Sequence, residues 1–228
     1  MTLYHWQTQF EHYLQQQGQS EDGAHDIAHF RRVWSSAQHI MDERATPLTV
    51  LAACYFHDIV NLPKNHPERH LASRYSAKEA TAILAHHFPA FPKALYPDIA
   101  HAIEAHSFSA GIPPVSIEAK IVQDADRLEA LGAIGLARVF YVSGQLGHPL
   151  FHPDDPFAQQ RKLDDTRWAL DHFQTKLLKL PETMQTEKGR ALARDKSNYL
   201  VGFMAKLSAE LRGEHHVLDE DVLRQFAL

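Results

Sequence analysis

Residues 47–60 read PLTVLAACYFHDIV, a nearly uninterrupted apolar run that ends in a histidine and an aspartate. A threonine precedes the proline that opens this run, and that pair is typical of a helix start, because a proline in the first turn lacks only an N–H group that has no helical partner there. We predict a buried helix that ends near Pro63. Its last turns carry His57 and Asp58.

Apolar side chains recur at helical spacing along most of the remaining chain, which predicts an all-α protein. One such stripe contains Leu3, Trp6, Phe10 and Leu14, and the next contains Ile27, Phe30, Val33, Ala37 and Ile40. Further helices are predicted over residues 72–87, 93–107, 115–143, 164–180 and 187–212, separated by breaks that contain proline. The aromatic residues at helical spacing are interpreted as core: Trp34, Phe140, Tyr141 and Trp168.

A chain of 228 residues with 44% hydrophobic content can bury one substantial core. We therefore predict a single helical bundle over residues 1–213 and a polar tail over residues 214–228. The tail either packs locally or serves a subunit contact, so a homodimer stays open. Residues 144–157 contain three prolines, which exclude a continuous helix, and the length of this segment favours a lid or a binding loop.

The charge pattern excludes some partners. The net charge is −5 and the basic residues are scattered, so the chain lacks the electrostatic footprint of a protein that binds long nucleic acids. No run approaches the roughly 18 consecutive apolar residues of a membrane span, and the start lacks the layout of a signal peptide. We expect a cytoplasmic protein with no membrane partner. The single cysteine, Cys54, is predicted to be a small buried hydrophobe.

The pair His57–Asp58 calls for a partner of opposite charge, because a carboxylate buried alone costs several kcal/mol. Neighbouring helix residues point about 100° apart, so both can contact one ion only if other helices complete its shell. The chain has 17 histidines, and imidazole is a common ligand for transition metals. His29 and Asp126 are the best candidates, since Asp126 interrupts a pattern of buried residues.

Several nearby residues have more than one interpretation. His25 lies four residues before His29 on the same helix face and is a further ligand, an orienting neighbour or a surface residue. Asp124 is interpreted as a hydrogen-bond acceptor or a helix-pairing acid. Gly132 and Gly135 are predicted to allow close approach of helices. Taken alone, His57–Asp58 would better suit a satisfied surface pair at a capped helix end than a metal site.

The order of these motifs resembles the HD superfamily of metal-dependent phosphohydrolases. The matching phrases are HFRRV with His29, YFHDIV with His57 and Asp58, and DADRLEALGAIG with Asp126. The resemblance covers residues 24–140. The phrases HDIVNLPKNHPERHLASRYSAKEA and IEAHSFSAG look like the small bacterial HD proteins that include nucleotide pyrophosphohydrolases.

The resemblance implies an HD-type bundle with a divalent ion held by His29, His57, Asp58 and Asp126. Water and substrate oxygens would complete a site for Mn²⁺ or Mg²⁺. Zn²⁺, Co²⁺, Ni²⁺ and Fe²⁺ stay open, because nitrogen and oxygen ligands accept several ions. A bound dication lowers the pKa of its water toward about 7 and stabilises charge on a phosphoryl oxygen. The chain is thus expected to be an enzyme, with His57 and Asp58 in its catalytic centre.

Phosphate oxygens also call for fixed cations. Lys64, Arg69 and Arg127 lie after or within the ligand segments and are predicted to bind substrate phosphates, with Lys64 and Arg69 also assisting catalysis. Arg127 can instead pair with a neighbouring acid. His106 is predicted to contact the substrate. Two-metal members of the superfamily carry further ligands near His106 and His86–His87. A second ion, with Asp58 bridging the two ions, is therefore an alternative to a single ion.

The expected reaction is hydrolysis of a small nucleotide, specifically release of pyrophosphate from a nucleoside triphosphate. Cleavage of phosphate monoesters or diesters is the alternative within the same superfamily. The chain lacks the combined HHE-DG-GYP phrase of cyclic dinucleotide phosphodiesterases. A different class of function is an HD protein that binds and senses a nucleotide without turnover. A histidine-rich metal buffer is disfavoured, because the histidines are scattered along predicted helices.

Overall fold

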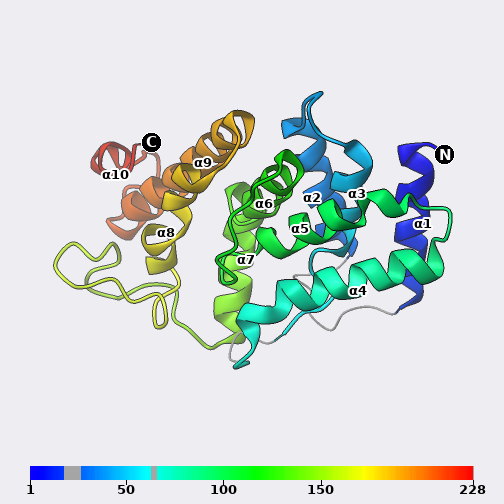
Figure 1. The fold of residues 1–228 in the computed structure, drawn as a ribbon. Coiled ribbons are helices and arrows are strands. Elements are labelled where there is room, and N and C mark those ends of the chain that lie inside the picture. Colours follow the sequence, from blue (N-terminus) through cyan, green and yellow to red (C-terminus); the bar gives the residue numbers. More distant parts are fainter. Residues whose placement is uncertain (18–26, 63–65, 228) are drawn as a thin grey trace. The chain divides into compact units, whose positions relative to one another are not determined.

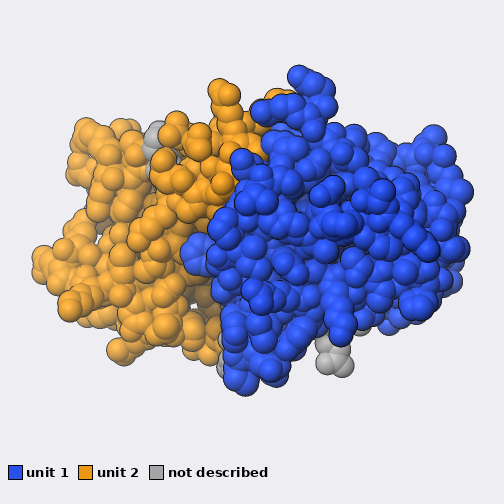
Figure 2. Space-filling view, in the orientation of Figure 1, with its two compact units in different colours: residues 1–126 blue, residues 127–228 orange. Residues whose placement is uncertain are grey.

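The computed structural model describes residues 1–17, 27–62 and 66–227, and in all of these residues the regular elements are helices (Figure 1). The all-α prediction is confirmed. The chain forms two compact units, Met1–Asp126 and Arg127–Leu228 (Figure 2). The single bundle predicted for residues 1–213 stays a prediction.

The first unit is built around a central buried helix. Its helices are α1 (Leu3–Gln16), α2 (Ile27–Ile40), α3 (Pro47–Phe56), α4 (Ala72–His87), α5 (Tyr96–His106) and α6 (Ile117–Leu128), the last of which ends in the second unit. Two short 3₁₀ helices, η1 (Arg69–Leu71) and η2 (Lys93–Leu95), precede α4 and α5. Every residue from Thr49 to Phe56 is buried, and α3 contacts α1, α2, α4 and α5. A helix that is apolar all round can be stable only in such a position.

The apolar stripe of α1 joins an aromatic cluster in this core. The ring of Phe10 lies 5.0 Å from that of Phe56 and 5.1 Å from that of Phe88, in edge-to-face geometry. The ring of Trp6 lies 5.0 Å from that of Phe91. Such pairs each contribute roughly 0.5–1.5 kcal/mol beyond the burial of their area. The stripes predicted for α1 and α2 are confirmed as core except at their first residues, since Leu3 is 37% exposed and Ile27 is half-buried.

The histidine–aspartate pair lies just beyond α3 rather than in its last turns. The helix ends at Phe56, and His57 is its C-cap residue. The Val60 N–H donates to the Ser76 hydroxyl (3.1 Å), which in turn donates to the Val60 carbonyl (3.2 Å). Because Ser76 of α4 bonds both backbone groups of Val60, the chain leaves the helical path here, and the turn that carries Asp58 is fixed against α4.

The second unit contains α7 (Gly132–Gln145), α8 (Asp171–Thr175), the 3₁₀ helix η3 (Leu177–Thr183), α9 (Glu187–Leu211) and α10 (Glu220–Gln225). The long helix α9 contacts α7, η3 and α10. Val222 of α10 is buried, and the Asp219 carboxylate that caps α10 accepts from the Ser208 hydroxyl at 2.6 Å. The C-terminal tail therefore packs locally against α9.

Two predicted helices are wrong. Residues 115–143 form two helices, because Gly132 adopts a left-handed φ of +67° between α6 and α7. A Cβ at Gly135 would lie 2.2 Å from the Ala130 carbonyl oxygen, so Gly135 serves the turn. A Cβ at Gly132 would lie 3.3 Å from Cγ of Lys196 in α9, so Gly132 also allows the close approach of a helix that was predicted. Residues 164–180 contain only α8 and part of η3, since the segment before α8 is held by side-chain hydrogen bonds.

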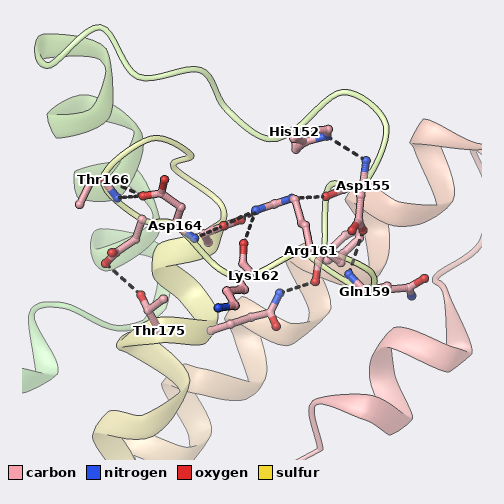
Figure 3. A network of polar contacts seen from close by, with 12 residues as sticks. His152, Asp155, Gln159, Arg161, Lys162, Asp164, Thr166 and Thr175 are labelled. Atoms are coloured by element: carbon pink, nitrogen blue, oxygen red, sulfur yellow. Dashed lines mark hydrogen bonds and ion pairs between the residues drawn. The ribbon is translucent and has the colours of Figure 1, made fainter.

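Figure 3 shows those hydrogen bonds. The Arg161 guanidinium donates to both oxygens of the buried Asp171 carboxylate, at 2.6 and 2.7 Å. The Asp164 N–H donates to the same carboxylate at 2.7 Å. The Asp155 carboxylate accepts from the N–H groups of residues 159 and 160 (2.9 Å each). The connection from α7 to α8 is thus an ordered segment with its own polar core, and its role as a lid stays a prediction.

The aromatic residues predicted to be core differ in exposure. Trp34 and Trp168 are buried, and Phe140 is half-buried. Tyr141 is 51% exposed, so its interpretation as core is wrong. Its neighbour Phe140 faces Phe173 and Phe203, and consecutive helix residues point about 100° apart. Among the described residues, no helix has both the length and the apolarity needed to cross a bilayer.

Candidate metal centre

Four segments of the first unit bring imidazole and carboxylate groups together. His29 lies in α2, His57 caps α3, and Asp126 lies in α6. The Nε2 atoms of His29 and His57 are 3.2 Å apart, and each lies 3.6 Å from Oδ1 of Asp126. The potential ligand atoms of these three residues all lie within 4.8 Å of one another, which is close enough to share one metal ion.

A second group of three shares His57 with the first. Oδ2 of Asp58 lies 3.7 Å from Nε2 of His57, and Oδ1 of Asp58 lies 3.3 Å from Nε2 of His106. His106 is the last residue of α5 and is 5% exposed. The structure thus places the four predicted ligands in two groups that share His57, and the second group also contains His106, for which a contact with the substrate was predicted. That these residues hold a metal stays a prediction.

His57 and His106 both turn Nε2 toward the cluster, because a backbone carbonyl holds Nδ1 of each ring. Nδ1 of His57 lies 2.9 Å from the Cys54 carbonyl, and Nδ1 of His106 lies 2.6 Å from the Ile103 carbonyl. A carbonyl can only accept, so each Nδ1 carries the hydrogen. In the neutral rings, the lone pair is therefore on Nε2 and faces the carboxylates. Metal-binding histidines are commonly oriented by such a bond from the other ring nitrogen.

The charges of the cluster favour a cation. Burial lowers the pKa of His57, but the charge of Asp58 and the hydrogen bond and charge of Asp126 raise it to about 9. Burial likewise raises the pKa of Asp126, but the hydrogen bond and charge of His57, together with the charges of His106 and His29, outweigh this effect and hold the pKa of Asp126 below its ordinary value. Imidazole nitrogens and carboxylate oxygens are a donor set that fits divalent transition metals and Mn²⁺. The residues present therefore fit a divalent ion.

The cluster is closed on its histidine side and more open on its carboxylate side. The side chains of His29 and His57 are at most 1% exposed, whereas those of Asp58 and Asp126 are 20% and 28% exposed. Water or a substrate can therefore reach the cluster past the two carboxylates. Cys54, whose carbonyl bonds His57, is fully buried, as predicted. Burial raises the pKa of its thiol.

The predicted cationic residues are less clearly placed. Lys64 and His25 lie outside the described residues. Arg69 donates to the Asn61 side chain (2.8 Å) and to the Leu62 carbonyl, so it holds the segment that follows the histidine–aspartate turn. Arg127 donates to the carbonyl of Thr183 (2.8 Å) within the second unit. Binding of substrate phosphate by Lys64, Arg69 and Arg127 stays a prediction.

The other histidines singled out in the sequence lie elsewhere. His86 and His87 are exposed in the last turn of α4, where the ring of His87 lies 4.8 Å from that of Tyr13. Neither belongs to a potential metal group among the described residues. Asp124 is fully buried and is also outside both groups.

Sequence reasoning missed Gln123, which joins two of the segments that build the cluster. Its side-chain amide donates to the Ala105 carbonyl at 2.6 Å and is buried. This bond holds α6, which carries Asp126, against the last turn of α5, which carries His106. The available signal was a polar side chain beside Asp124 at a position that the amphipathic pattern places inside the protein.

Comparisons with known proteins agree with this geometry. The HD domain family model matches residues 26–131. The chain is 33% identical to YpgQ of Bacillus subtilis over 198 residues, which cover 85% of this chain and 87% of that protein. The chain belongs to the HD superfamily of hydrolases.

Solved structures extend the likeness to nearly the whole chain. YpgQ in complex with ADP is 29% identical with a TM-score of 0.67, and the match covers 92% of this chain and 97% of that one. An HD-superfamily hydrolase from Bacillus thuringiensis is 25% identical with a TM-score of 0.71, covering 92% of this chain and 99% of the other. Each of these two relatives therefore contains counterparts of both units in one chain.

Proposed function

We propose that this protein is a metal-dependent phosphohydrolase that acts on a small nucleotide and releases pyrophosphate from a nucleoside triphosphate. The observation that carries the proposal is the convergence of His29, His57, Asp58 and Asp126, with the more open carboxylate side available to a substrate. A nucleotide is favoured because YpgQ, which is similar over most of the chain, was crystallised in complex with ADP.

The four residues would hold a divalent ion, which supplies an activated water and stabilises charge on a phosphoryl oxygen. The chain's own contribution is orientation. The Cys54 carbonyl fixes the ring of His57, and Ser76 fixes the turn that carries Asp58. Cys54 and Ser76 are buried, and their bonds hold the ring of His57 and the turn of Asp58 in place. Groups that are oriented in advance favour the charge distribution of the transition state.

His106 lies beside His57 in the second group, with the two rings 4.8 Å apart. Its Nε2 lies 3.3 Å from Oδ1 of Asp58, and its Nδ1 is bonded to the Ile103 carbonyl. We assign it a contact with Asp58 and, through the open side, with a substrate phosphate. Arg69 and Lys64 follow in the next segment and would supply positive charge to the outer phosphates.

The test is a turnover assay with nucleoside mono-, di- and triphosphates in the presence of Mn²⁺, Mg²⁺ or Co²⁺, with products separated by chromatography. We expect pyrophosphate and a nucleoside monophosphate from at least one triphosphate, and loss of this activity on chelation. Release of orthophosphate from a nucleoside monophosphate would instead indicate a phosphomonoesterase. Tight nucleotide binding without any product would overturn the enzymatic proposal and favour a nucleotide sensor.

A further inference from the structure

Gln123 in α6 links two segments that carry potential metal ligands (Figure 1). Its side-chain Nε2 donates to the Ala105 carbonyl of α5 at 2.6 Å, and the residue is 3% exposed. Ala105 immediately precedes His106, and Gln123 lies three residues before Asp126. Residues three apart in a helix are neighbours on its surface, so the bond holds α6 within one turn of Asp126. A single hydrogen bond therefore joins the segments that supply a ligand to each of the two groups.

The acceptor of this bond is a carbonyl at the end of a helix. α5 ends at His106, and the next residue, Ser107, has an extended backbone with a ψ of 127°. The carbonyls of a last helical turn have no N–H partners within the helix. Two of them accept from side chains here: the Ile103 carbonyl from Nδ1 of His106, and the Ala105 carbonyl from Gln123. The end of α5, and with it the ring of His106, is therefore held in part from α6.

The position of α6 depends on bonds of this kind. Within the described residues, α6 makes few close backbone approaches to any other helix. Its first turn is tied to the start of α3 by the Thr46 N–H, which donates to the Glu118 carboxylate at 2.9 Å. Glu118 lies about 12 Å along the helix from Asp126, whereas Gln123 lies within one turn of it. Of these two bonds, the one from Gln123 is the better placed to fix Asp126 relative to α5.

Capping of a helix end does not by itself account for a glutamine at this position. Oε1 of Gln123 is buried and has no hydrogen-bond partner among the described residues. A buried oxygen without a partner lowers the stability of a fold. The amide thus satisfies one polar group of the interior and leaves another unsatisfied. Proteins commonly accept such a local cost at functional sites.

We propose that Gln123 is a positioning residue of the metal centre: its bond to the Ala105 carbonyl sets the distance between α5 and α6, so that the two groups of ligands fit around the metal. This inference rests on the metal centre of the proposed function and does not depend on the substrate. Metal–ligand distances are held within about 0.2 Å. A shift of α6 that the rest of the fold tolerates would therefore be enough to weaken binding by Asp126.

Metal binding by Gln123→Met tests the inference, because methionine has a similar length and no donor for the carbonyl. The full chain is titrated with Mn²⁺ and with Co²⁺, whose visible absorption reports the number and geometry of its ligands. We expect the affinity of the variant for both ions to fall by at least about tenfold, and the Co²⁺ spectrum to change.

Glu118→Ala is the matched control, because it breaks the bond at the start of α6, two helical turns from Asp126. It should lower the urea midpoint, leave the affinity for both ions within about twofold of the wild type, and leave the Co²⁺ spectrum unchanged. Urea unfolding of each metal-free protein thus separates positioning of the ligands from stability of the fold.

A loss of stability in Gln123→Met with unchanged metal affinity and Co²⁺ spectrum would overturn the inference, as would an equal loss of affinity in Glu118→Ala. If Gln123→Met does not fold, Gln123→Asn gives the same comparison, because its amide is one methylene group too short to reach the carbonyl. A wild-type chain that binds neither ion would contradict the metal centre itself. A wild-type chain that binds both ions, with unaffected Gln123 variants, would contradict this inference alone.

Discussion

The Nε2 atoms of His29 and His57 lie 3.2 Å apart in the interior of the first unit, and both side chains are at most 1% exposed. Two nitrogen lone pairs at this distance repel each other, so a proton or a metal ion must lie between them. Since Nδ1 of His57 is already bonded to the Cys54 carbonyl, this proton or ion is bound at the Nε2 side. This relationship links the protonation of the metal-free protein to metal binding.

The stability of the metal-free protein should fall as the pH rises. The pKa of His57 is raised from its ordinary 6.5 to about 9 in the folded chain, so its contribution is fully present below pH 6.5 and is lost as the pH rises through about 9. The Tm in the presence of a chelator should therefore drop between pH 6.5 and 9.5. His57→Gln should flatten this dependence of Tm on pH, and His86→Gln, at an exposed position, should not. Equal slopes of Tm against pH for the wild type and both variants would contradict the assignment of this effect to His57.

Metal binding should release a proton at neutral pH. The ion takes the place of the hydrogen on Nε2 of His57, so Mn²⁺ binding at pH 7.5 is expected to release about one proton and to tighten as the pH rises toward 9. Titrations in buffers with different heats of ionisation measure this number directly. A binding heat that is independent of the buffer would show that His57 is not protonated in the metal-free protein.

Removal of a proposed ligand should abolish metal binding and leave the fold helical. His57→Ala and Asp58→Ala are each expected to lower the affinity for Mn²⁺ by more than about 100-fold, because loss of even an indirect partner of a metal ligand commonly costs about 10- to 100-fold. The metal content of purified protein and the far-ultraviolet circular dichroism are the measurements. His86→Ala, at an exposed position, is the control. Full metal content in both ligand variants would exclude this centre.

The bond from the Thr46 N–H to the Glu118 carboxylate (2.9 Å) should be important for stability, because it joins the start of α3 to the first turn of α6. Glu118→Ala leaves this N–H group without its acceptor and is expected to cost about 1–3 kcal/mol in the free energy of unfolding. Glu118→Gln keeps a carbonyl oxygen and should lose less. Urea unfolding measures both. Exposed Glu79→Ala should change stability by less than about 0.5 kcal/mol, and a similar loss there would contradict the argument.

The turn between α6 and α7 should require glycine. Gly132 has a φ of +67°, and a Cβ there would lie 3.3 Å from Cγ of Lys196, so Gly132→Ala is expected to destabilise the protein by about 1–2 kcal/mol. Gly144→Ala is the matched control in α7, because no atom lies within 4 Å of its added Cβ and alanine favours helix. Thermal unfolding should therefore move in opposite directions for the two variants, and a loss at Gly144 equal to that at Gly132 would contradict this explanation.

Local sequence determined which segments are helical and which side chains are candidates for chemistry. The stripes of α1 and α2, the apolar run of α3, and the order of His29, His57, Asp58 and Asp126 could all be identified because helical spacing and motif order are properties of neighbouring residues. The same spacing continued through residues 115–143 and 164–180, and there it predicted too much helix. Periodicity does not report a left-handed glycine or a network such as Arg161–Asp171.

Only the tertiary structure decided that His106 joins the cluster and that Gln123 ties α6 to α5. These relationships depend on how helices dock across long separations in the chain. Docking is set by the packing of whole faces rather than by any single residue, so the sequence alone could nominate ligands but could not place their neighbours.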